Sequence, residues 1–224
     1  MRELVITFHG LGDPPPYVPT GERPYWCNPA TFADFLDRIS ELRDSSSLKL
    51  SITFDDGNAS DFLIALPELL KRKLTAAFFV CAGRIGENGY LDSAMMRDLI
   101  RSNMHVGSHG MLHRPWPGLP ARELEVEIVE ARKIIEDVLG QQVTSAAVPF
   151  GLYNRRVLQR LRRASWQCIY TSDRGTTDEA AWLKPRHTID ATMQNQDILT
   201  EFSARQPVHT QARRMASNFY KRLR

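Results

Sequence analysis

Short apolar segments of strand length alternate with longer segments of helical periodicity along nearly the whole chain, and this alternation limits the fold more than any other feature. The strand-like segments lie at residues 4–8, 48–54, 74–81, 104–107, 144–148, 167–171 and 183–189. The helix-like segments lie at residues 29–39, 59–72, 93–102, 120–139 and 154–163. Such alternation favours an α/β fold with a parallel sheet, either doubly wound or closed into a barrel. No shift in composition marks a boundary, so we expect a single domain over residues 1–224.

Composition excludes several other classes of protein. Hydrophobic residues make up 42% and charged residues 25%, which are globular values and argue against a disordered chain or a coiled coil. The net charge of +3 is too small to predict nucleic-acid binding, and no apolar run reaches the roughly 18 residues of a membrane span. The short apolar stretch after Met1 does not have the form of a signal peptide, and the cysteines form no closely spaced pair. We therefore expect a cytoplasmic protein without disulfides.

Two of the helix-like segments carry further signals. Pro67 should kink or split the helix at residues 59–72, because proline cannot donate a backbone hydrogen bond. The segment at residues 120–139 has an apolar stripe, charged residues elsewhere, and Gly140 at its end. It is the clearest helix of the chain.

The C-terminal residues 205–224 combine basic and apolar side chains. They include Arg213, Arg214, Lys221, Arg222 and Arg224, with Met215, Phe219 and Tyr220 between them. The pattern predicts a basic helical tail, which is either solvated or lies on anionic lipid. The second alternative would place the protein at the inner face of the membrane.

Polar residues gather where the predicted strands end. Asp55 and Asp56 follow the second strand, His109 and His113 follow the strand at 104–107, and His9 follows the first. Active sites of parallel α/β folds lie at the C-terminal ends of the strands. Each group also has a plain structural interpretation, since Asp-Gly is common in turns and a lone histidine pair is often a surface feature.

Together these residue types specify a chemistry. One aspartate and two histidines, the histidines sharing one face at i and i+4, form a three-ligand set that leaves metal positions open. A second aspartate can act as general base on the attacking water, and a further histidine can protonate a leaving group. The combination predicts hydrolysis of an amide or an ester.

Three sequence motifs resemble those of the polysaccharide deacetylase family (carbohydrate esterase family 4, the NodB-homology domain). They are Thr53-Phe54-Asp55-Asp56-Gly57, the histidine-pair segment at residues 107–115, and Val148-Pro149-Phe150-Gly151. The resemblance implies a distorted (β/α) barrel of about seven parallel strands and a metal-dependent deacetylase of N-acetylated sugars. It implies Asp55 as general base, Asp56, His109 and His113 as ligands of a divalent metal, usually zinc, and the Phe150 N–H as an oxyanion donor.

The chain departs from the family pattern at two places. Many members have an arginine two residues before the proline of the third motif, where it orients the catalytic aspartate, whereas this chain has Ala147. We expect Arg186 to supply that guanidinium. The late histidine motif that carries the general acid is also absent, and His9 resembles the acid of an exopolysaccharide-type branch. We therefore prefer His9 as the acid, with His187 as the alternative; if Arg186 points into the barrel, its neighbour His187 should point away.

The substrate is less determined by the sequence. Tyr25 and Trp26 of the first loop and Trp116 after the histidine motif are candidates to stack on sugar rings, although loop aromatics also simply pack. The expected partner is an N-acetylated sugar, and the basic tail would suit a lipid-linked one. Two alternatives remain open at this stage: a deacylase of a non-sugar amide, and an inactive carbohydrate-binding relic.

Overall fold

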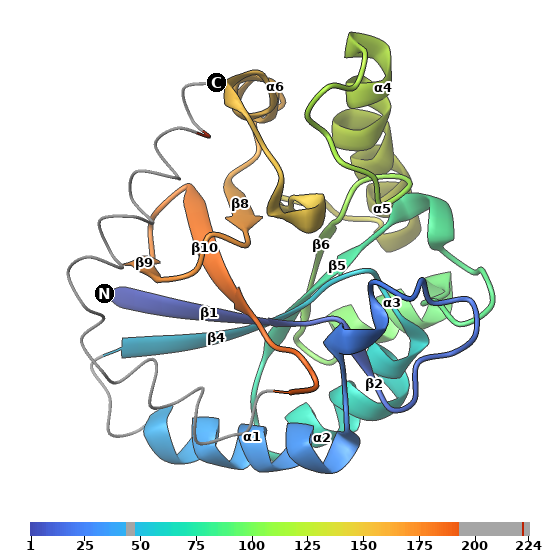
Figure 1. Ribbon diagram of the computed structural model, residues 1–224. Coiled ribbons are helices and arrows are strands. Elements are labelled where there is room, and N and C mark those ends of the chain that lie inside the picture. The colour runs from blue at the N-terminus through green and yellow to red at the C-terminus, as the bar shows by residue number, and fades with distance from the viewer. Residues whose placement is uncertain (44–47, 193–220, 222–224) are drawn as a thin grey trace.

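Seven parallel strands close into a barrel in the computed structural model, which describes residues 1–43, 48–192 and 221 (Figure 1). The strands are β1 (Arg2–Phe8), β4 (Leu48–Phe54), β5 (Ala76–Val80), β6 (His105–Ser108), β7 (Ser145–Ala147), β8 (Cys168–Thr171) and β10 (Leu183–Thr188). They pair in chain order, and β10 pairs back onto β1 to close the ring. The expected α/β barrel is confirmed.

The closure between β1 and β10 is uneven, and this makes the barrel distorted. The C-terminal half of β1 pairs with β10, whereas Arg2, Glu3 and Leu4 pair with an antiparallel strand, β9 (Thr176–Asp178), which the sequence did not predict. Beyond the barrel, β2 (Gly10–Leu11) and β3 (Trp26–Cys27) form a short parallel pair.

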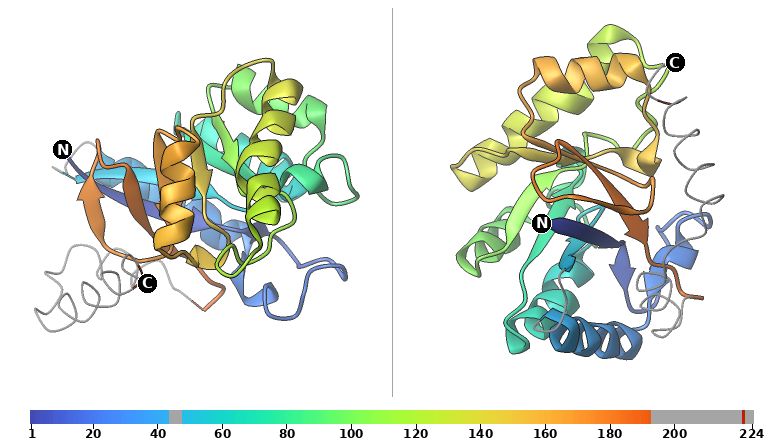
Figure 2. Two further views of the ribbon diagram at one scale, coloured as in Figure 1. Left: turned by 90° about the horizontal axis from the view of Figure 1, so that it is seen from above. Right: turned by 90° about the vertical axis from the view of Figure 1, so that its left-hand side faces the viewer.

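The helices lie around the outside of the strands, as the right-hand view of Figure 2 shows. They are α1 (Pro29–Arg43), α2 (Leu66–Lys71), α3 (Ser93–Arg101), α4 (Ala121–Glu125), α5 (Ala131–Leu139) and α6 (Arg155–Arg163). Local sequence sets their ends. The Asn154 side chain accepts a hydrogen bond from the backbone N–H of Val157 and caps α6, and Gly140 ends α5 in the left-handed conformation at φ 67°.

Two of the predicted helices contain π-helical segments. The helix at 59–72, which Pro67 was expected to kink or split, consists of η2 (Asp61–Ala65) followed by α2, in which Pro67 is the second residue. The predicted helix at 120–139 is α4 and α5 joined by η4 (Val126–Glu130). Such segments are rare and frequently occur at functional sites. Three short 3₁₀ turns, η1 (Arg23–Tyr25), η3 (Ala82–Arg84) and η5 (Pro149–Gly151), occupy loops at strand ends.

Alternate side chains of the strands serve two different environments. Phe8 points outward to α1, with its ring centroid 5.1 Å from that of Phe32. Glu3 lies on the opposite face of β1 and points inward. It accepts hydrogen bonds from Ser51 and from Lys184, both at 2.5 Å. The apolar core therefore lies between strands and helices, while the barrel interior carries charged and polar groups that pair with one another.

The basic tail predicted at 205–224 lies outside the described residues except for Lys221. The Nζ atom of Lys221 is 2.8 Å from Oδ1 of Asp173. Within the described part of the chain, no helix combines the length and the apolar character that a membrane crossing requires.

Candidate active site

Asp55 and Arg186 form a buried, two-pronged ion pair inside the barrel. The two terminal nitrogens of Arg186 donate to the two carboxylate oxygens of Asp55, each at 2.6 Å. Arg186 is fully buried, and it also donates to the hydroxyls of Thr7 and Thr53 at 3.2 Å. The guanidinium fork matches the carboxylate geometry and fixes the carboxylate's orientation. The Arg186 guanidinium therefore lies in direct contact with the Asp55 carboxylate.

The environment keeps Asp55 ionised. Burial alone would raise the pKa of its carboxyl, but the Arg186 charge and the hydrogen bonds from Arg186 outweigh burial and hold that pKa well below its usual range. Asp55 can therefore accept a proton at neutral pH. Its Oδ2 lies 3.8 Å from Nε2 of His109, which places it beside the histidine pair.

Asp56, His109 and His113 form the group that could hold a metal ion. One ligand atom from each lies within 4.8 Å of the others. Asp56 Oδ1 is 3.6 Å from Nε2 of His109 and 3.1 Å from Nε2 of His113. This Oδ1 is buried and has no hydrogen bond of normal geometry. A buried carboxylate oxygen facing two imidazole nitrogens, without a hydrogen-bond donor of its own, fits a cation site.

Unusual backbone conformations place two of these ligands. Asp56 has φ 76° and His113 has φ 50°, both in the left-handed region that few non-glycine residues adopt. Asp56 therefore leaves the alternation of β4, and its side chain turns toward the histidines. The histidine pair lies on a turn after β6 and not on a helix. Such strain costs of order 1–3 kcal/mol per residue and concentrates at functional sites.

The second nitrogen of each histidine ring is also held. Nδ1 of His109 lies 2.9 Å from the backbone oxygen of Ala147, so this ring presents Nε2 to the site. Burial lowers the pKa of His109 to about 4, which leaves its imidazole neutral at physiological pH. Nδ1 of His113 lies 3.3 Å from Oε1 of Glu22. Burial lowers the pKa of His113, but Glu22 and Asp56 outweigh it and raise that pKa above its usual value.

His9 and His187, the two candidate acids, lie in different environments. His9 follows β1 at the same rim as Asp55, whose backbone N–H donates to the Phe8 carbonyl. Its Nδ1 is buried without a hydrogen-bond partner. In contrast, Nε2 of His187 accepts a hydrogen bond from the backbone N–H of Gly175 at 2.6 Å. Arg186 points into the barrel and His187 is tied to the β8–β9 loop, as strand alternation requires.

Phe150 stands at the turn after β7 with φ 58°, and its ring centroid is 4.5 Å from that of His113. Its side chain is exposed, so the turn borders the open side of the site. The elements that meet at this rim are the ends of β1, β4, β6, β7 and β10.

A family model for polysaccharide deacetylases matches residues 43–169, more than half of the chain. The chain belongs to the polysaccharide deacetylase family. The matched range includes both aspartates, the histidine pair and Phe150, but it does not include His9 or Arg186.

Two curated relatives show the same family. The chain is 25% identical over 151 residues to a putative polysaccharide deacetylase, YxkH, of Bacillus subtilis. The aligned segment covers 67% of this chain and 54% of the relative. The chain is also 26% identical over 137 residues to a peptidoglycan-N-acetylglucosamine deacetylase of Bacillus cereus, and this aligned segment covers 61% of each protein. The chain therefore matches little more than half of the length of these relatives.

Solved structures share the fold of this family member. The deacetylase PplD of Streptococcus pyogenes, determined in complex with acetate, superposes with a TM-score of 0.80 at 19% identity, over 91% of this chain and 99% of that one. IcaB of Ammonifex degensii superposes with a TM-score of 0.69 at 21% identity, over 84% and 91%. At these identities the likeness concerns the fold.

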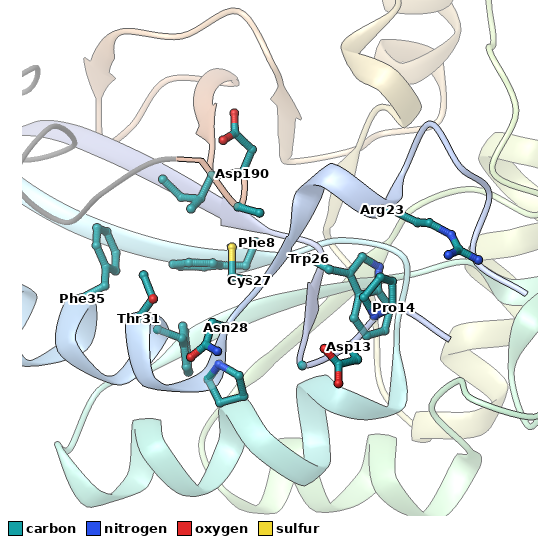
Figure 3. A pocket seen from close by; sticks show the side chains of 15 residues that line it. Phe8, Asp13, Pro14, Arg23, Trp26, Cys27, Asn28, Thr31, Phe35 and Asp190 are labelled. Carbon is teal, nitrogen blue, oxygen red and sulfur yellow. The ribbon is translucent and has the colours of Figure 1, made fainter. Parts of the chain in front are cut away.

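The three aromatic residues expected to stack on sugars lie in three different places in this family member. Tyr25 is 38% exposed, with its ring centroid 5.2 Å from that of His9. Trp26 packs over Gly10 and lines a separate cavity of about 490 Å³ with Asp13, Cys27 and Asp190 (Figure 3). None of the metal-binding group lines this cavity.

The expectation for Trp116 is wrong. Trp116 is 1% exposed and belongs to the hydrophobic core, so its ring faces no open surface on which a sugar could stack. The tryptophan packs under the histidine turn, where its Nε1 would lie 3.2 Å from a Cβ placed on Gly110.

Sequence reasoning missed two acidic residues that hold the histidine turn. Glu127 of η4 is fully buried, accepts hydrogen bonds from the backbone N–H groups of Met111 and Leu112, and pairs with Arg114 at 2.9 Å. Its spacing from Leu124 and Ala131 puts it on the apolar stripe, and this could have revealed it. Glu22 lies in the irregular first loop, where no periodicity points to a partner.

Proposed function

We propose that this chain is a metal-dependent hydrolase that removes N-acetyl groups from an amino-sugar-containing glycan or glycolipid precursor. The observation that supports it most is the convergence of Asp56, His109 and His113 within 4.8 Å, directly beside an aspartate that Arg186 keeps ionised. The names of the family and of the Bacillus cereus relative support an N-acetylated amino sugar as the substrate class.

The donor set fits a zinc ion better than a harder cation. Two imidazole nitrogens and one carboxylate oxygen are typical ligands of catalytic zinc, with positions left for water and substrate, whereas magnesium and calcium favour all-oxygen sites. When bound here, such an ion would act as a Lewis acid toward the acetyl carbonyl and the attacking water.

The chain's own residues then have distinct tasks. Asp55, ionised and oriented by Arg186, accepts the proton of the attacking water. The backbone N–H of Phe150 donates to the carbonyl oxygen as negative charge develops on it. His9 donates a proton to the leaving nitrogen, because an amine anion is a very poor leaving group. Tyr25, beside His9, borders the position of the sugar ring.

We also propose a compartment for the protein and a lipid-linked form of its substrate. Three free cysteines, Cys27, Cys81 and Cys168, support a reducing compartment such as the cytoplasm. The basic residues within 205–224 support contact with an anionic membrane face and hence a lipid-linked substrate. Vesicle binding by the full chain, compared with a chain whose basic residues there are changed to glutamine, tests this part.

The central experiment combines metal content with acetate release. Purified protein loaded with zinc should hold about one ion per chain and release acetate from N-acetylated amino-sugar oligomers. Asp56→Asn should lose both properties. Asp55→Asn should keep the metal and lose about 10²–10⁴-fold in rate, since a general base typically contributes that much. Absence of bound metal in the wild type would refute the proposal; loss of metal in Asp55→Asn would mean that the two aspartates have exchanged roles.

A further inference from the structure

Glu22, in the first loop, contacts the metal-binding group formed by Asp56, His109 and His113. Its Oε1 lies 3.3 Å from Nδ1 of His113, and Nε2 of the same ring faces Asp56 Oδ1 at 3.1 Å. The His113 side chain is 5% exposed, so the two carboxylates enclose the ring from its two nitrogen ends. The proposed roles of the other site residues do not use Glu22.

The chemistry of the pair decides which nitrogen of His113 is free for a ligand. An ionised carboxylate only accepts hydrogen bonds, so a hydrogen bond to Glu22 requires the proton to be on Nδ1. The neutral ring then has its lone pair on Nε2, which is the nitrogen directed at Asp56 and toward His109. Carboxylates commonly fix the tautomer and the ring orientation of metal-binding histidines in this way.

We propose that Glu22 is the positioning residue of His113: it holds the proton on Nδ1 and keeps Nε2 directed into the metal-binding group. The inference rests on the proposed function for the identity of that group as a zinc site. His109 has a backbone acceptor instead, the carbonyl of Ala147 in β7, which is part of the barrel. Of the two histidines, only His113 therefore depends on a side chain from outside the barrel.

The first loop holds Glu22 in place by its own hydrogen bonds. The backbone N–H of Glu22 donates to the Pro19 carbonyl at 2.9 Å, and Nε of the next residue, Arg23, donates to the Val18 carbonyl at 3.2 Å. The same segment carries Tyr25 to the side of His9. The loop therefore contacts both the metal-binding group, through Glu22, and the proposed acid, through Tyr25.

The first test reads the tautomer directly and needs no metal. Nitrogen-15 spectra of the histidine rings are recorded on metal-free protein at a pH where His113 is neutral. The wild type should show the proton of His113 on Nδ1, and Glu22→Gln should keep it there, because the amide oxygen also accepts. Glu22→Ala should shift His113 toward the Nε2–H form. A wild type with the proton on Nε2 would overturn the inference, whatever the metal content of the protein.

The second test measures zinc affinity by competition with a chelator near neutral pH. Glu22→Ala should weaken binding by about 10–100-fold, which is the usual effect of losing such a partner, and Glu22→Gln should weaken it less. Asp13→Ala is the matched control, since Asp13 is an exposed acid of the same loop, and it should leave affinity unchanged. Affinity of Glu22→Ala equal to that of Asp13→Ala would overturn the inference. A wild type with the Nδ1–H tautomer but no zinc would refute the proposed function and still support the role of Glu22.

Discussion

At the scale of single residues, the guanidinium that holds Asp55 comes from Arg186 of β10. Position 147, where the resemblance to the family led us to expect arginine, holds a fully buried alanine whose carbonyl faces Nδ1 of His109. Arg186 reaches Asp55 from β10, which a single strand, β1, separates from β4. Because the C-terminal ends of parallel strands converge, the same contact can be made from several sequence positions.

Arg186→Met should shift the pH dependence of the reaction. The pKa of Asp55 is lower in the folded than in the unfolded protein. The ion pair between Asp55 and Arg186 therefore stabilises the fold at pH values above about 3.9, the pKa of an aspartate in an unfolded chain. This stabilisation is lost as the pH falls through the pKa of Asp55 in the folded protein. Without the guanidinium the pKa should rise by about 1–3 units, and the acidic limb of kcat/KM should move up with it. Urea unfolding at neutral pH should show a loss of about 3–5 kcal/mol, because a buried carboxylate loses its partner. An unchanged pH profile would exclude the pair's role in setting the basicity of Asp55.

His9→Ala should remove acid catalysis and leave the metal. We expect a loss of about 10²–10⁴-fold on an N-acetylated sugar, and a much smaller loss on an ester with a good leaving group, which needs no protonation. His187→Gln is the comparison, because His187 holds the Gly175 N–H and should affect stability more than rate. Acetate release with both substrates, together with zinc content, checks this. Near-normal amide hydrolysis by His9→Ala would exclude His9 as the acid.

At the scale of elements, the histidine turn depends on the π-helical segment η4. The segment places Glu127, a charged residue, on the buried side of a helix whose charged residues were expected at the surface. There its carboxylate is held against the turn by two backbone N–H groups and by Arg114. A sequence pattern predicts the helix at 120–139 from its apolar stripe, but the extra residue of a π turn leaves no mark in that pattern. The helix and the buried position of Glu127 on its apolar stripe were therefore predictable, whereas the partners of Glu127 in the histidine turn were not.

Gly110→Ala should disrupt this contact. Gly110 has φ 82°, and a Cβ there would lie 2.5 Å from Oε2 of Glu127, so the carboxylate or the turn must move. Gly118→Ala is a matched control, since Gly118 has φ 87° and open space around its Cβ position. Both variants should lose about 1–2 kcal/mol of unfolding free energy to the left-handed backbone. Only Gly110→Ala should lose more than this and bind zinc more weakly. Equal losses in the two variants would show that the contact with Glu127 is not needed.

At the scale of the whole molecule, the sequence predicts the strands of the barrel better than it predicts the contacts that the loops make at its rim. All seven parallel strands follow from apolar periodicity, and the rim residues follow from where those strands end. The antiparallel β9 was missed because its residues are only partly buried and carry no apolar alternation. The burial of Trp116 and the contact of Glu22 with His113 depend on how loops fold back over the rim. Such tertiary contacts between distant segments leave no local pattern in the sequence.

A third aspartate, Asp61, lies buried near Asp55 and Asp56. Asp61, in η2, is fully buried, and neither of its carboxylate oxygens has a hydrogen-bond partner of normal geometry. Burial, and then the charges of Asp56 and Asp55, raise its pKa well above the usual value. No task in the proposed reaction falls to Asp61, so its charged form is a cost to folding.

Asp61→Asn should stabilise the metal-free protein at neutral pH. Because the folded pKa of Asp61 is raised, its contribution to stability is fully present below the unfolded pKa of about 3.9 and is lost as pH rises through the folded pKa. The asparagine has no carboxyl proton to lose. The variant should therefore match the wild type near pH 4 and exceed it by about 1–3 kcal/mol at pH 8, the range expected for an unsatisfied buried group.

Urea unfolding in the presence of a chelator, at several pH values between 4 and 8, measures this difference. Asp34→Asn provides the control, since Asp34 is exposed on α1. The unfolding free energy of this variant should differ from that of the wild type by the same small amount at every pH between 4 and 8. A cation held by Asp56 would oppose the repulsion from the neighbouring carboxylates, so adding zinc should reduce the advantage of Asp61→Asn. A difference that is independent of pH would mean that asparagine acts through packing alone, because only the loss of a titrating carboxyl can produce the pH dependence.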